Sequence, residues 1–190
     1  MSSSRHATTA VPLHPLLAAR HSTRALDPNG TVTDSQVTAL LEAARWAPSC
    51  GNTQPSRFIV ARKETETFAT VLATLNPGNQ GWARHAALLI VGIRTTNNEK
   101  GPLPYADYDL GQAMGHLVVQ AMAEGLTARQ MGGFDASAIT KGFDLAENLV
   151  PTSVVAIGVA GDPTTLPDDL RRPDDAPRTR IPLDELIIAD

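Results

Sequence analysis

The chain has 190 residues, of which 42% are apolar and 19% charged, a composition that is typical of a folded globular protein and excludes a disordered chain. Its net charge of −4 at pH 7 argues against a nucleic-acid-binding protein, because such proteins usually gather a basic excess on one face. The longest apolar run, residues 86–93, is much shorter than the roughly 20 residues that span a bilayer.

Residue types that bind metals or form disulfides are sparse. Cys50 is the single cysteine, which excludes an intramolecular disulfide, and the five histidines lack the spacing of metal ligands. We therefore predict no metal site. A lone cysteine, together with an N-terminus that lacks the apolar core of a signal peptide, favours a cytoplasmic location.

The first long element predicted along the chain is a helix that begins near Thr33, after a short helix over residues 12–20. Thr33, with Gln36 three residues later, has the spacing of a capping box, in which two side chains satisfy free N–H groups at a helix start. Apolar residues then recur at intervals of three and four, namely Val37, Leu40, Leu41 and Ala44. We expect Trp46 to close this apolar face.

A polar loop of small residues follows between two prolines, Pro48 and Pro55. Pro48 ends the helix, and Pro55 favours an extended conformation at Gln54. The residues between the prolines can present hydrogen-bonding groups to a planar polar ligand, but they are equally typical of a helix–strand connector. Composition alone leaves both interpretations open.

Strands and helices are predicted to follow one another as far as residue 159. Strands are expected over residues 58–61, 87–93, 126–131 and 153–159, and helices over residues 64–75, 105–124 and 136–143. The strand at 87–93 is apolar on both faces, so we place it in the middle of a sheet covered by helices on both sides. Residues 76–79 are predicted as a turn and residues 95–104 as a surface loop.

The helix over residues 105–124 contains two glycines, Gly111 and Gly115, one turn apart. Each costs roughly 1 kcal/mol of helix propensity relative to alanine. Their common face therefore indicates a closely packed neighbour, which is either another helix of this chain or the same helix of a two-fold partner.

The composition changes after Gly161. Prolines and aspartates exclude a core element from the next stretch, yet the last ten residues, IPLDELIIAD, are again apolar. We therefore divide the chain into a globular unit, residues 1–161, and a C-terminal arm, residues 162–190, which packs on its own body or on a second subunit.

Two basic clusters and a glycine pair are the candidates for chemistry. The basic clusters consist of Arg20, His21 and Arg24 with Ser22, and of Arg178 and Arg180. Guanidinium groups match phosphate oxygens, and a nearby hydroxyl can bind a third oxygen. The glycine pair, in QMGGFD at residues 130–135, lets the backbone approach a ligand, without the spacing of a dinucleotide fingerprint or a Walker loop. Each cluster taken singly is also compatible with solvated charge or an ordinary turn.

Taken together, these stretches resemble the nitroreductase family of FMN-dependent oxidoreductases. The runs RHSTRA, APSCGNTQPS, QMGGFD (with the GL at residues 125–126) and PRTRIP are similar to four motifs of that family and occur in the family's order. The resemblance implies an α+β fold, a mixed and mostly antiparallel sheet flanked by helices, and an intertwined homodimer.

The resemblance also implies a role for each matching residue. Arg20, Ser22, Arg178 and Arg180 would hold the FMN phosphate, His21 would lie along the ribityl chain, and Arg24 would lie near the pyrimidine end of the ring. Pro48, Ser49, Cys50 and Asn52 would reach the flavin from the other subunit, and Gln130, Met131, Gly132 and Gly133 would face the ring. No catalytic side chain is assigned, because solvent can protonate the product. Ser56 departs from the family, which commonly has an aromatic residue there, and the loop at residues 95–104 is short.

The expected activity is that of an FMN-dependent NAD(P)H oxidoreductase. NADH or NADPH would reduce the flavin at N5, and a nitroaromatic, a quinone or a similar small molecule would reoxidise it in a ping-pong cycle. Two alternatives stay open: specialised flavin chemistry on the same fold (dehalogenation, flavin fragmentation or enal reduction) and a non-catalytic flavin-binding protein. Neither nucleic acid nor a membrane is expected as a partner.

Overall fold

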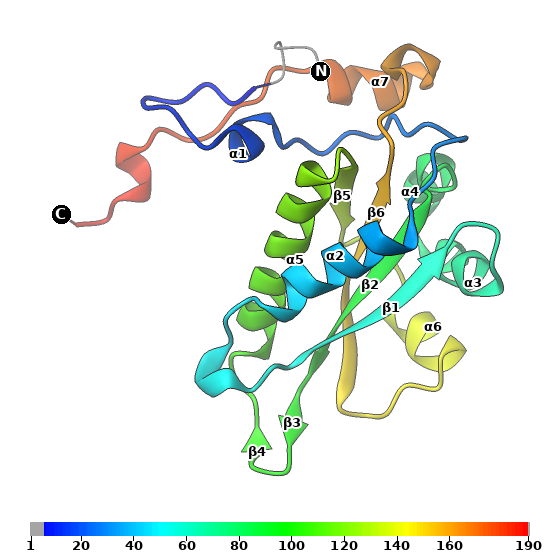
Figure 1. Cartoon of the computed structure of the whole chain (residues 1–190), viewed down its shortest axis with the longest axis vertical. Helices are drawn as coiled ribbons and strands as arrows, with labels where there is room; N and C mark the ends of the chain where they lie inside the picture. Colours follow the sequence, from blue (N-terminus) through cyan, green and yellow to red (C-terminus); the bar gives the residue numbers. More distant parts are fainter. Residues whose placement is uncertain (1–5, 190) are drawn as a thin grey trace.

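A four-stranded antiparallel sheet forms the centre of the molecule (Figure 1). The computed structural model describes residues 6–189, apart from the side chains of residues 172–175. The strands are β1 (Ser56–Arg62), β2 (Leu88–Thr95), β5 (Thr127–Met131) and β6 (Leu149–Gly158), in the order β1-β2-β6-β5. The α+β class is confirmed. All three pairings are antiparallel, so the expectation of a mixed sheet is wrong for these strands.

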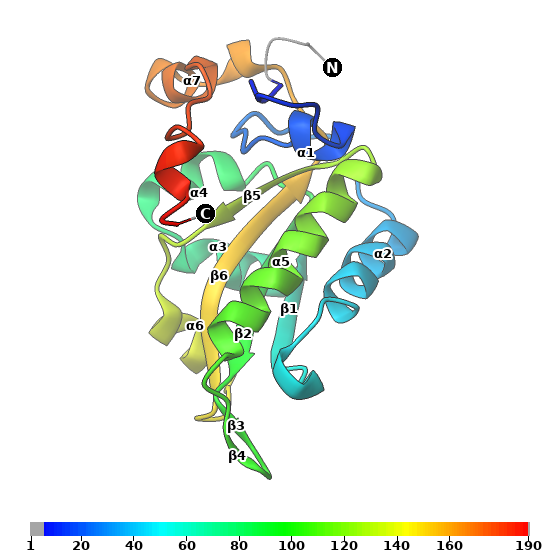
Figure 2. The same cartoon turned by 90° about the vertical axis from the view of Figure 1, so that its left-hand side faces the viewer.

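Helices cover both faces of this sheet (Figures 1 and 2). One face carries α2 (Asp34–Arg45) and α5 (Ala106–Ala123), and the other carries α3 (Glu66–Thr74), α4 (Pro77–Ala83) and α6 (Ala136–Gly142). Along β2, Leu88 and Ile90 pack into the first layer, whereas Leu89, Val91 and Ile93 pack into the second. The predicted mid-sheet position of this doubly apolar strand is thereby confirmed.

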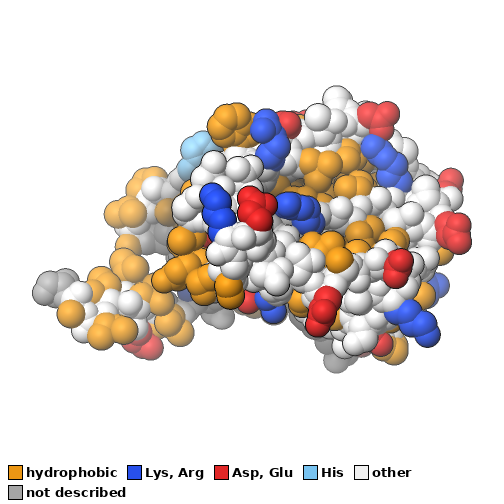
Figure 3. All heavy atoms as spheres, turned by 90° about the horizontal axis from the view of Figure 1, so that it is seen from below, with side chains coloured by type: hydrophobic (Ala, Val, Ile, Leu, Met, Phe, Trp, Pro, Cys, Tyr) orange, Lys and Arg blue, Asp and Glu red, His pale blue; other side chains and the backbone are white. Residues whose placement is uncertain are grey.

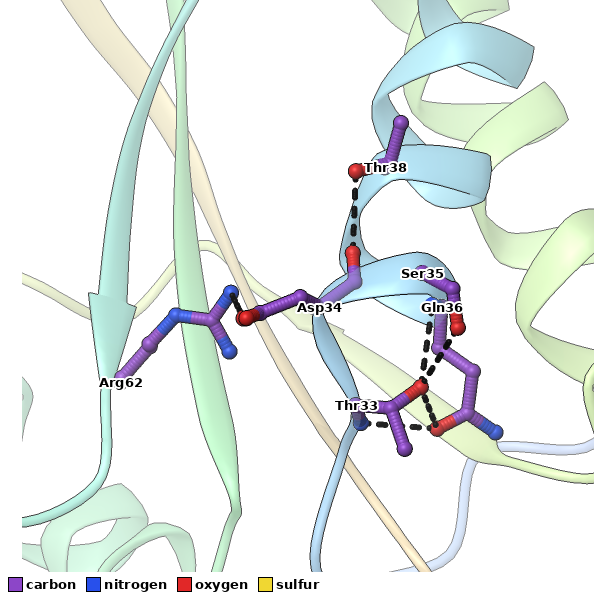
Figure 4. A network of polar contacts seen from close by, with 6 residues as sticks. All are labelled: Thr33, Asp34, Ser35, Gln36, Thr38 and Arg62. Atoms are coloured by element: carbon purple, nitrogen blue, oxygen red, sulfur yellow. Dashed lines mark hydrogen bonds and ion pairs between the residues drawn. The ribbon is translucent and has the colours of Figure 1, made fainter.

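The capping box at the start of α2 is confirmed (Figure 4). Thr33 Oγ1 accepts from the Gln36 N–H at 3.2 Å, and Gln36 Oε1 accepts from the Thr33 N–H at 2.9 Å. Asp34, the first residue of the helix, pairs with Arg62 of β1 at 2.6 Å. The helix start is therefore capped locally and fastened to the edge strand of the sheet.

Thr33→Ala is expected to lower the free energy of unfolding by about 1 kcal/mol, because the Gln36 N–H loses its acceptor at the helix start. Urea denaturation measures the change. Thr38→Ala is the matched control, since the exposed Thr38 hydroxyl only bonds back to the Asp34 carbonyl within the same helix. An equal loss in both variants would contradict a specific contribution from the cap.

Two loop predictions are wrong because local signals were ambiguous. Residues 76–79 do not form a free turn but begin α4. Pro77 occupies the first position of this helix, and proline is as common there as it is in turns. Residues 95–104 include a small exposed hairpin, made by β3 (Asn97–Asn98) and β4 (Gly101–Pro102).

Two predictions about the end of α2 are also wrong. Trp46 does not close the apolar face; it lies one residue beyond the helix, is 74% exposed, and has the Arg45 guanidinium over its ring at 5.1 Å. Gln54 is not extended, since its φ is 48°. Its N–H donates to Ser49 Oγ at 3.0 Å, and this tight turn overrides the preference that Pro55 imposes.

The arm runs back over the end of the sheet that carries α1 (Pro15–Ala19) (Figure 1). It forms α7 (Asp168–Asp175), which its prolines did not predict, and a short 3-10 turn at Asp184–Leu186. Its apolar side chains from Ile181 to Ile188 are at least half exposed, and Figure 3 shows apolar side chains on the part that extends away from the body. A hollow of about 810 Å³ separates this stretch from N-terminal residues 7–17. The apolar end is thus not buried against its own chain.

In the part of the chain that the structure describes, no helix combines the length and the apolar character needed to cross a bilayer.

Candidate functional site

The two basic clusters of the sequence meet in one pocket of about 330 Å³, between the segment after α1, strand β5 and the arm. The described residues that line it are Arg20, His21, Ser22, Arg24, Arg129, Ala176, Pro177, Arg178, Thr179 and Arg180. Arg20 and Arg180 lie at opposite ends of the chain, yet they share this pocket. We call it the basic pocket.

The C-terminal end of α1 organises one side of the basic pocket. Arg20 follows the helix directly, and its Nη1 donates to Ser22 Oγ at 3.2 Å. Arg178 Nη1 reaches across from the arm and donates to the carbonyl oxygen of Ala18 at 2.9 Å. A cation is favourable there, because the last carbonyls of a helix have no partner within it. This contact fixes the arm against the N-terminal segment.

His21 is oriented by the same helix end. Its Nδ1 lies 3.0 Å from the carbonyl oxygen of Ala19, and since a carbonyl only accepts, Nδ1 carries the hydrogen and donates it. In the neutral imidazole, Nε2 is then an acceptor. His21 can therefore accept a hydrogen bond from a hydroxyl group of a ligand.

The electrostatics of the basic pocket favour an anion. Burial lowers the pKa of the Arg20 guanidinium, and the positive charges of Arg178 and Arg180 lower it further. Arginine nevertheless stays protonated at neutral pH, so the groups repel one another. A phosphate between them would replace this repulsion with charge-assisted hydrogen bonds.

Arg129, which no motif in the sequence singled out, also lines the basic pocket from β5. Its Nη1 donates to the carbonyl oxygen of Ser22, and its guanidinium carbon lies 5.5 Å from the ring centroid of Trp82. The available signal was a charged residue inside a predicted strand, residues 126–131, because a charged side chain is rarely buried without a partner.

The stretch Gln130–Gly133 leaves the sheet beside α4. Met131 is buried in the core, so only its backbone can face a ligand, whereas Gln130 and Gly132 are exposed. The Gly133 carbonyl accepts from Asn79 Nδ2 at 3.1 Å and from the Asn76 N–H at 3.0 Å. A Cβ on Gly133 would lie 2.9 Å from Asn76 Nδ2, so a side chain at position 133 would force the Asn76 side chain to move.

The loop between Pro48 and Pro55 does not join the basic pocket. Pro48 and Ser49 line a separate pocket of about 360 Å³ with α2, β1 and α5, while Cys50 and Asn52 are exposed. The backbone N–H of Cys50 donates to the buried carboxylate of Asp109 at 3.1 Å, which fastens the loop to the start of α5. In Figures 1 and 2, this loop and α1 lie at opposite ends of the molecule.

Among the side chains that the structure describes, residues 6–171 and 176–189, no group of three or more possible metal ligands comes together.

The chain is similar to known proteins over most of its length. The model of the nitroreductase family matches residues 17–77 and 61–159. A 15.4 kDa protein of Mycolicibacterium smegmatis is 32% identical over 138 residues, which cover 68% of this chain and 92% of that protein. "Putative NAD(P)H nitroreductase YodC" of Bacillus subtilis is 28% identical over 182 residues, covering 78% of this chain and 89% of YodC. A crystal structure described as an oxidoreductase containing FMN superposes with a TM-score of 0.91 at 33% identity, covering 99% of this chain and 96% of that one.

Proposed function

The chain belongs to the nitroreductase family, and from this premise we propose that it is an FMN-dependent oxidoreductase that transfers electrons from NADH or NADPH to a small organic acceptor. The observation that carries the proposal is the basic pocket, in which Arg20, Arg178 and Arg180 surround a space suited to a phosphate. The FMN of the solved relative and the NAD(P)H in the name of YodC support the same assignment.

The residues of the basic pocket and the stretch Gln130–Gly133 would each bind a different part of the cofactor. Arg20, Ser22, Arg178 and Arg180 would hold the phosphate, and His21 Nε2 would accept from a ribityl hydroxyl. The backbone of Gln130, Met131, Gly132 and Gly133 would lie along the ring. Bound FMN would supply the hydride chemistry, which side chains cannot perform. We assign no general acid, because solvent can protonate the reduced acceptor.

Arg24 lines the same pocket and would lie near the pyrimidine end of the ring. A cation there stabilises the negative charge that the ring gains on reduction. Arg24→Ala is therefore expected to make the bound flavin harder to reduce, with a midpoint potential about 30 mV more negative, equivalent to about 1.4 kcal/mol for two electrons.

Spectroelectrochemical titration of the flavin measures this potential. Arg62→Ala is the control, because Arg62 lies on β1, the edge strand farthest from β5, and pairs with Asp34 of α2. The midpoint potential of flavin bound to this variant is expected to equal that of the wild type. An unchanged potential in Arg24→Ala would remove this role from Arg24.

We further propose that the functional unit is a homodimer. The loop residues Pro48, Ser49, Cys50 and Asn52 do not line the basic pocket of their own chain, and their loop lies at the end of the molecule opposite to α1 (Figures 1 and 2). They would therefore reach a flavin only in the pocket of a second chain. On α5, a Cβ added at Gly111 or Gly115 would meet none of the described residues within 4 Å, and the apolar end of the arm is exposed. Both features support such pairing, because they leave surface that a partner can cover. The arm, residues 162–190, would then pack on the partner subunit.

The proposed acceptors are nitroaromatics, quinones and similar small molecules. The test is to purify the protein with FMN and add NADH or NADPH without oxygen. Loss of the yellow colour, followed by its recovery on adding a nitroaromatic or a quinone, supports the proposal. Colour loss without recovery contradicts this acceptor class and points to specialised flavin chemistry. A failure to bleach with either nucleotide contradicts the oxidoreductase assignment and points to a binding protein.

A further inference from the structure

We propose that Arg129 is a positioning residue of the cofactor site, which holds Ser22 in place for the FMN phosphate. The inference rests on the proposed function, because it assumes that the basic pocket takes this phosphate. It adds a residue from the central sheet to the phosphate-binding residues, which otherwise come from the two ends of the chain.

Ser22 is an exposed residue of an irregular stretch in which Thr23 and Ala25 are buried. Residues 20–25 form neither a helix nor a strand. Arg20 Nη1 donates to its hydroxyl at 3.2 Å, and Arg129 Nη1 donates to its carbonyl oxygen. Two guanidinium groups thus hold this residue, one at the side chain and one at the backbone.

Arg129 can act as a rigid support because it is anchored at both ends. Its backbone belongs to β5, where it pairs with Ala156 of β6 in the sheet. Its guanidinium lies over the ring of Trp82, a side chain of α4 that is only 1% exposed. A planar guanidinium stacks on an aromatic face and still donates at its edge, which a lysine ammonium cannot do. The sheet and α4 therefore determine where the Ser22 carbonyl lies.

The same arrangement ties the two ends of the proposed flavin site together. Trp82 and Asn79 belong to one helix, and Asn79 holds the Gly133 carbonyl at the ring end. Arg129 joins this helix to Ser22 at the phosphate end. In metal sites, removing a residue that orients a ligating group typically costs about 10- to 100-fold in metal affinity, and we expect a loss of similar size here.

The distinguishing measurement is the affinity for FMN relative to riboflavin, which has the same ring and ribityl chain but no phosphate. Arg129→Met is expected to raise the Kd for FMN by about 10- to 100-fold. Its Kd for riboflavin is expected to change by no more than about twofold, as for a substitution that leaves the fold intact. Arg129→Lys is expected to fall between the wild type and Arg129→Met, because it keeps the charge and a donor but loses the planar stack.

Quenching of flavin fluorescence on titration with apoprotein gives both constants. Arg62→Met is the control for losing one positive charge outside the pocket, and neither Kd is expected to change. Equal weakening of FMN and riboflavin in Arg129→Met would show that Arg129 only packs the core, and an unchanged FMN Kd would show that it does not position Ser22. Either result overturns the inference.

Two further results keep the test decisive. If Arg129→Met does not fold, the ratio of the two constants in Arg129→Lys decides, and a ratio equal to that of the wild type overturns the inference. If the wild-type protein binds neither flavin, the proposed function itself fails. That outcome is distinct from a wild type that binds FMN and an Arg129 variant that binds it equally well.

Discussion

Arg20→Met is expected to leave a folded protein that no longer retains FMN. Arg20 stands between α1 and the arm, and it faces Arg178 and Arg180 across the basic pocket. Truncating one partner of a close, partly desolvated charge pair costs roughly 3 to 4 kcal/mol of binding free energy, which is about 100- to 1,000-fold in Kd. This is the largest loss we expect from a single substitution in the pocket.

The stability of the apoprotein is expected to respond differently from its affinity for FMN. Without an anion, Arg20 sits among like charges, so its removal relieves repulsion while it sacrifices one hydrogen bond to Ser22. The free energy of unfolding of the apoprotein should therefore change by no more than about 0.5 kcal/mol. Added FMN should raise the melting temperature of the wild type much more than that of the variant.

Isothermal titration of apoprotein with FMN gives the Kd, and thermal melts with and without FMN give the stabilisation. Arg178→Met is a second test in the same pocket and is expected to act in the same direction. Arg62→Met serves as the control outside it. An FMN Kd for Arg20→Met within about twofold of the wild-type value would exclude a phosphate from the basic pocket.

The double substitution Gly111→Leu with Gly115→Leu is expected to convert a dimer into monomers. A Cβ at either glycine would meet nothing within 4 Å among the described residues, so no helix that the structure describes explains why glycine is there. This open space supports the proposal that the helix of a two-fold partner packs against α5. Leucine is also the better helix former by close to 1 kcal/mol per position, so the monomer itself should not lose stability.

Two-fold symmetry would double the effect of each substitution on the stability of the dimer. Each substitution appears twice in an isologous interface, so the double variant inserts four leucine side chains between closely packed helices. Overpacking typically costs about 1–3 kcal/mol per site, which predicts a loss of about 4 kcal/mol or more, or roughly 1,000-fold in the dimer dissociation constant. FMN affinity should fall as well, because the loop residues Pro48 to Asn52 would no longer reach the partner's pocket.

Sedimentation velocity reports the oligomeric state, and urea denaturation reports the stability of the chain. Gly81→Leu is the matched control, since Gly81 is an exposed helical glycine with equally open surroundings in α4. It is expected to leave the sedimentation coefficient unchanged. A double variant that sediments like the wild type and retains FMN would contradict a dimer formed through α5.

Structural features that depend on a few neighbouring residues were predicted correctly. The capping box at Thr33 and Gln36 depends on two side chains and the backbone between them, and it forms as expected. The doubly apolar run of β2 required cover on both faces whatever its neighbours were, so its place in the sheet followed from burial alone.

Where two local structures suit the same residues, the sequence could not choose between them. The Asn-Pro-Gly-Asn run fits a turn, but it becomes the start of a helix because Trp82 and Ala83 are buried in the core one turn later. Pro55 favours an extended Gln54, yet the hydrogen bond to Ser49 holds a positive φ. Burial and hydrogen bonding decide such cases, since each is worth about as much as the local preference it opposes.

The residues by themselves determined most element positions and a set of candidate ligand-binding groups, because hydrophobic periodicity, caps and basic clusters are properties of neighbouring positions. The α+β class followed from the family resemblance that the order of the motifs carries. Only the tertiary structure decided that Arg20 and Arg180 share one pocket, that Arg129 supports Ser22 from the sheet, and that the loop after Pro48 lies at the other end of the molecule. These relations join positions far apart in the chain. They arise because the packing of the helices on the sheet brings distant parts of the backbone together, and a pattern of neighbouring residues does not specify that packing.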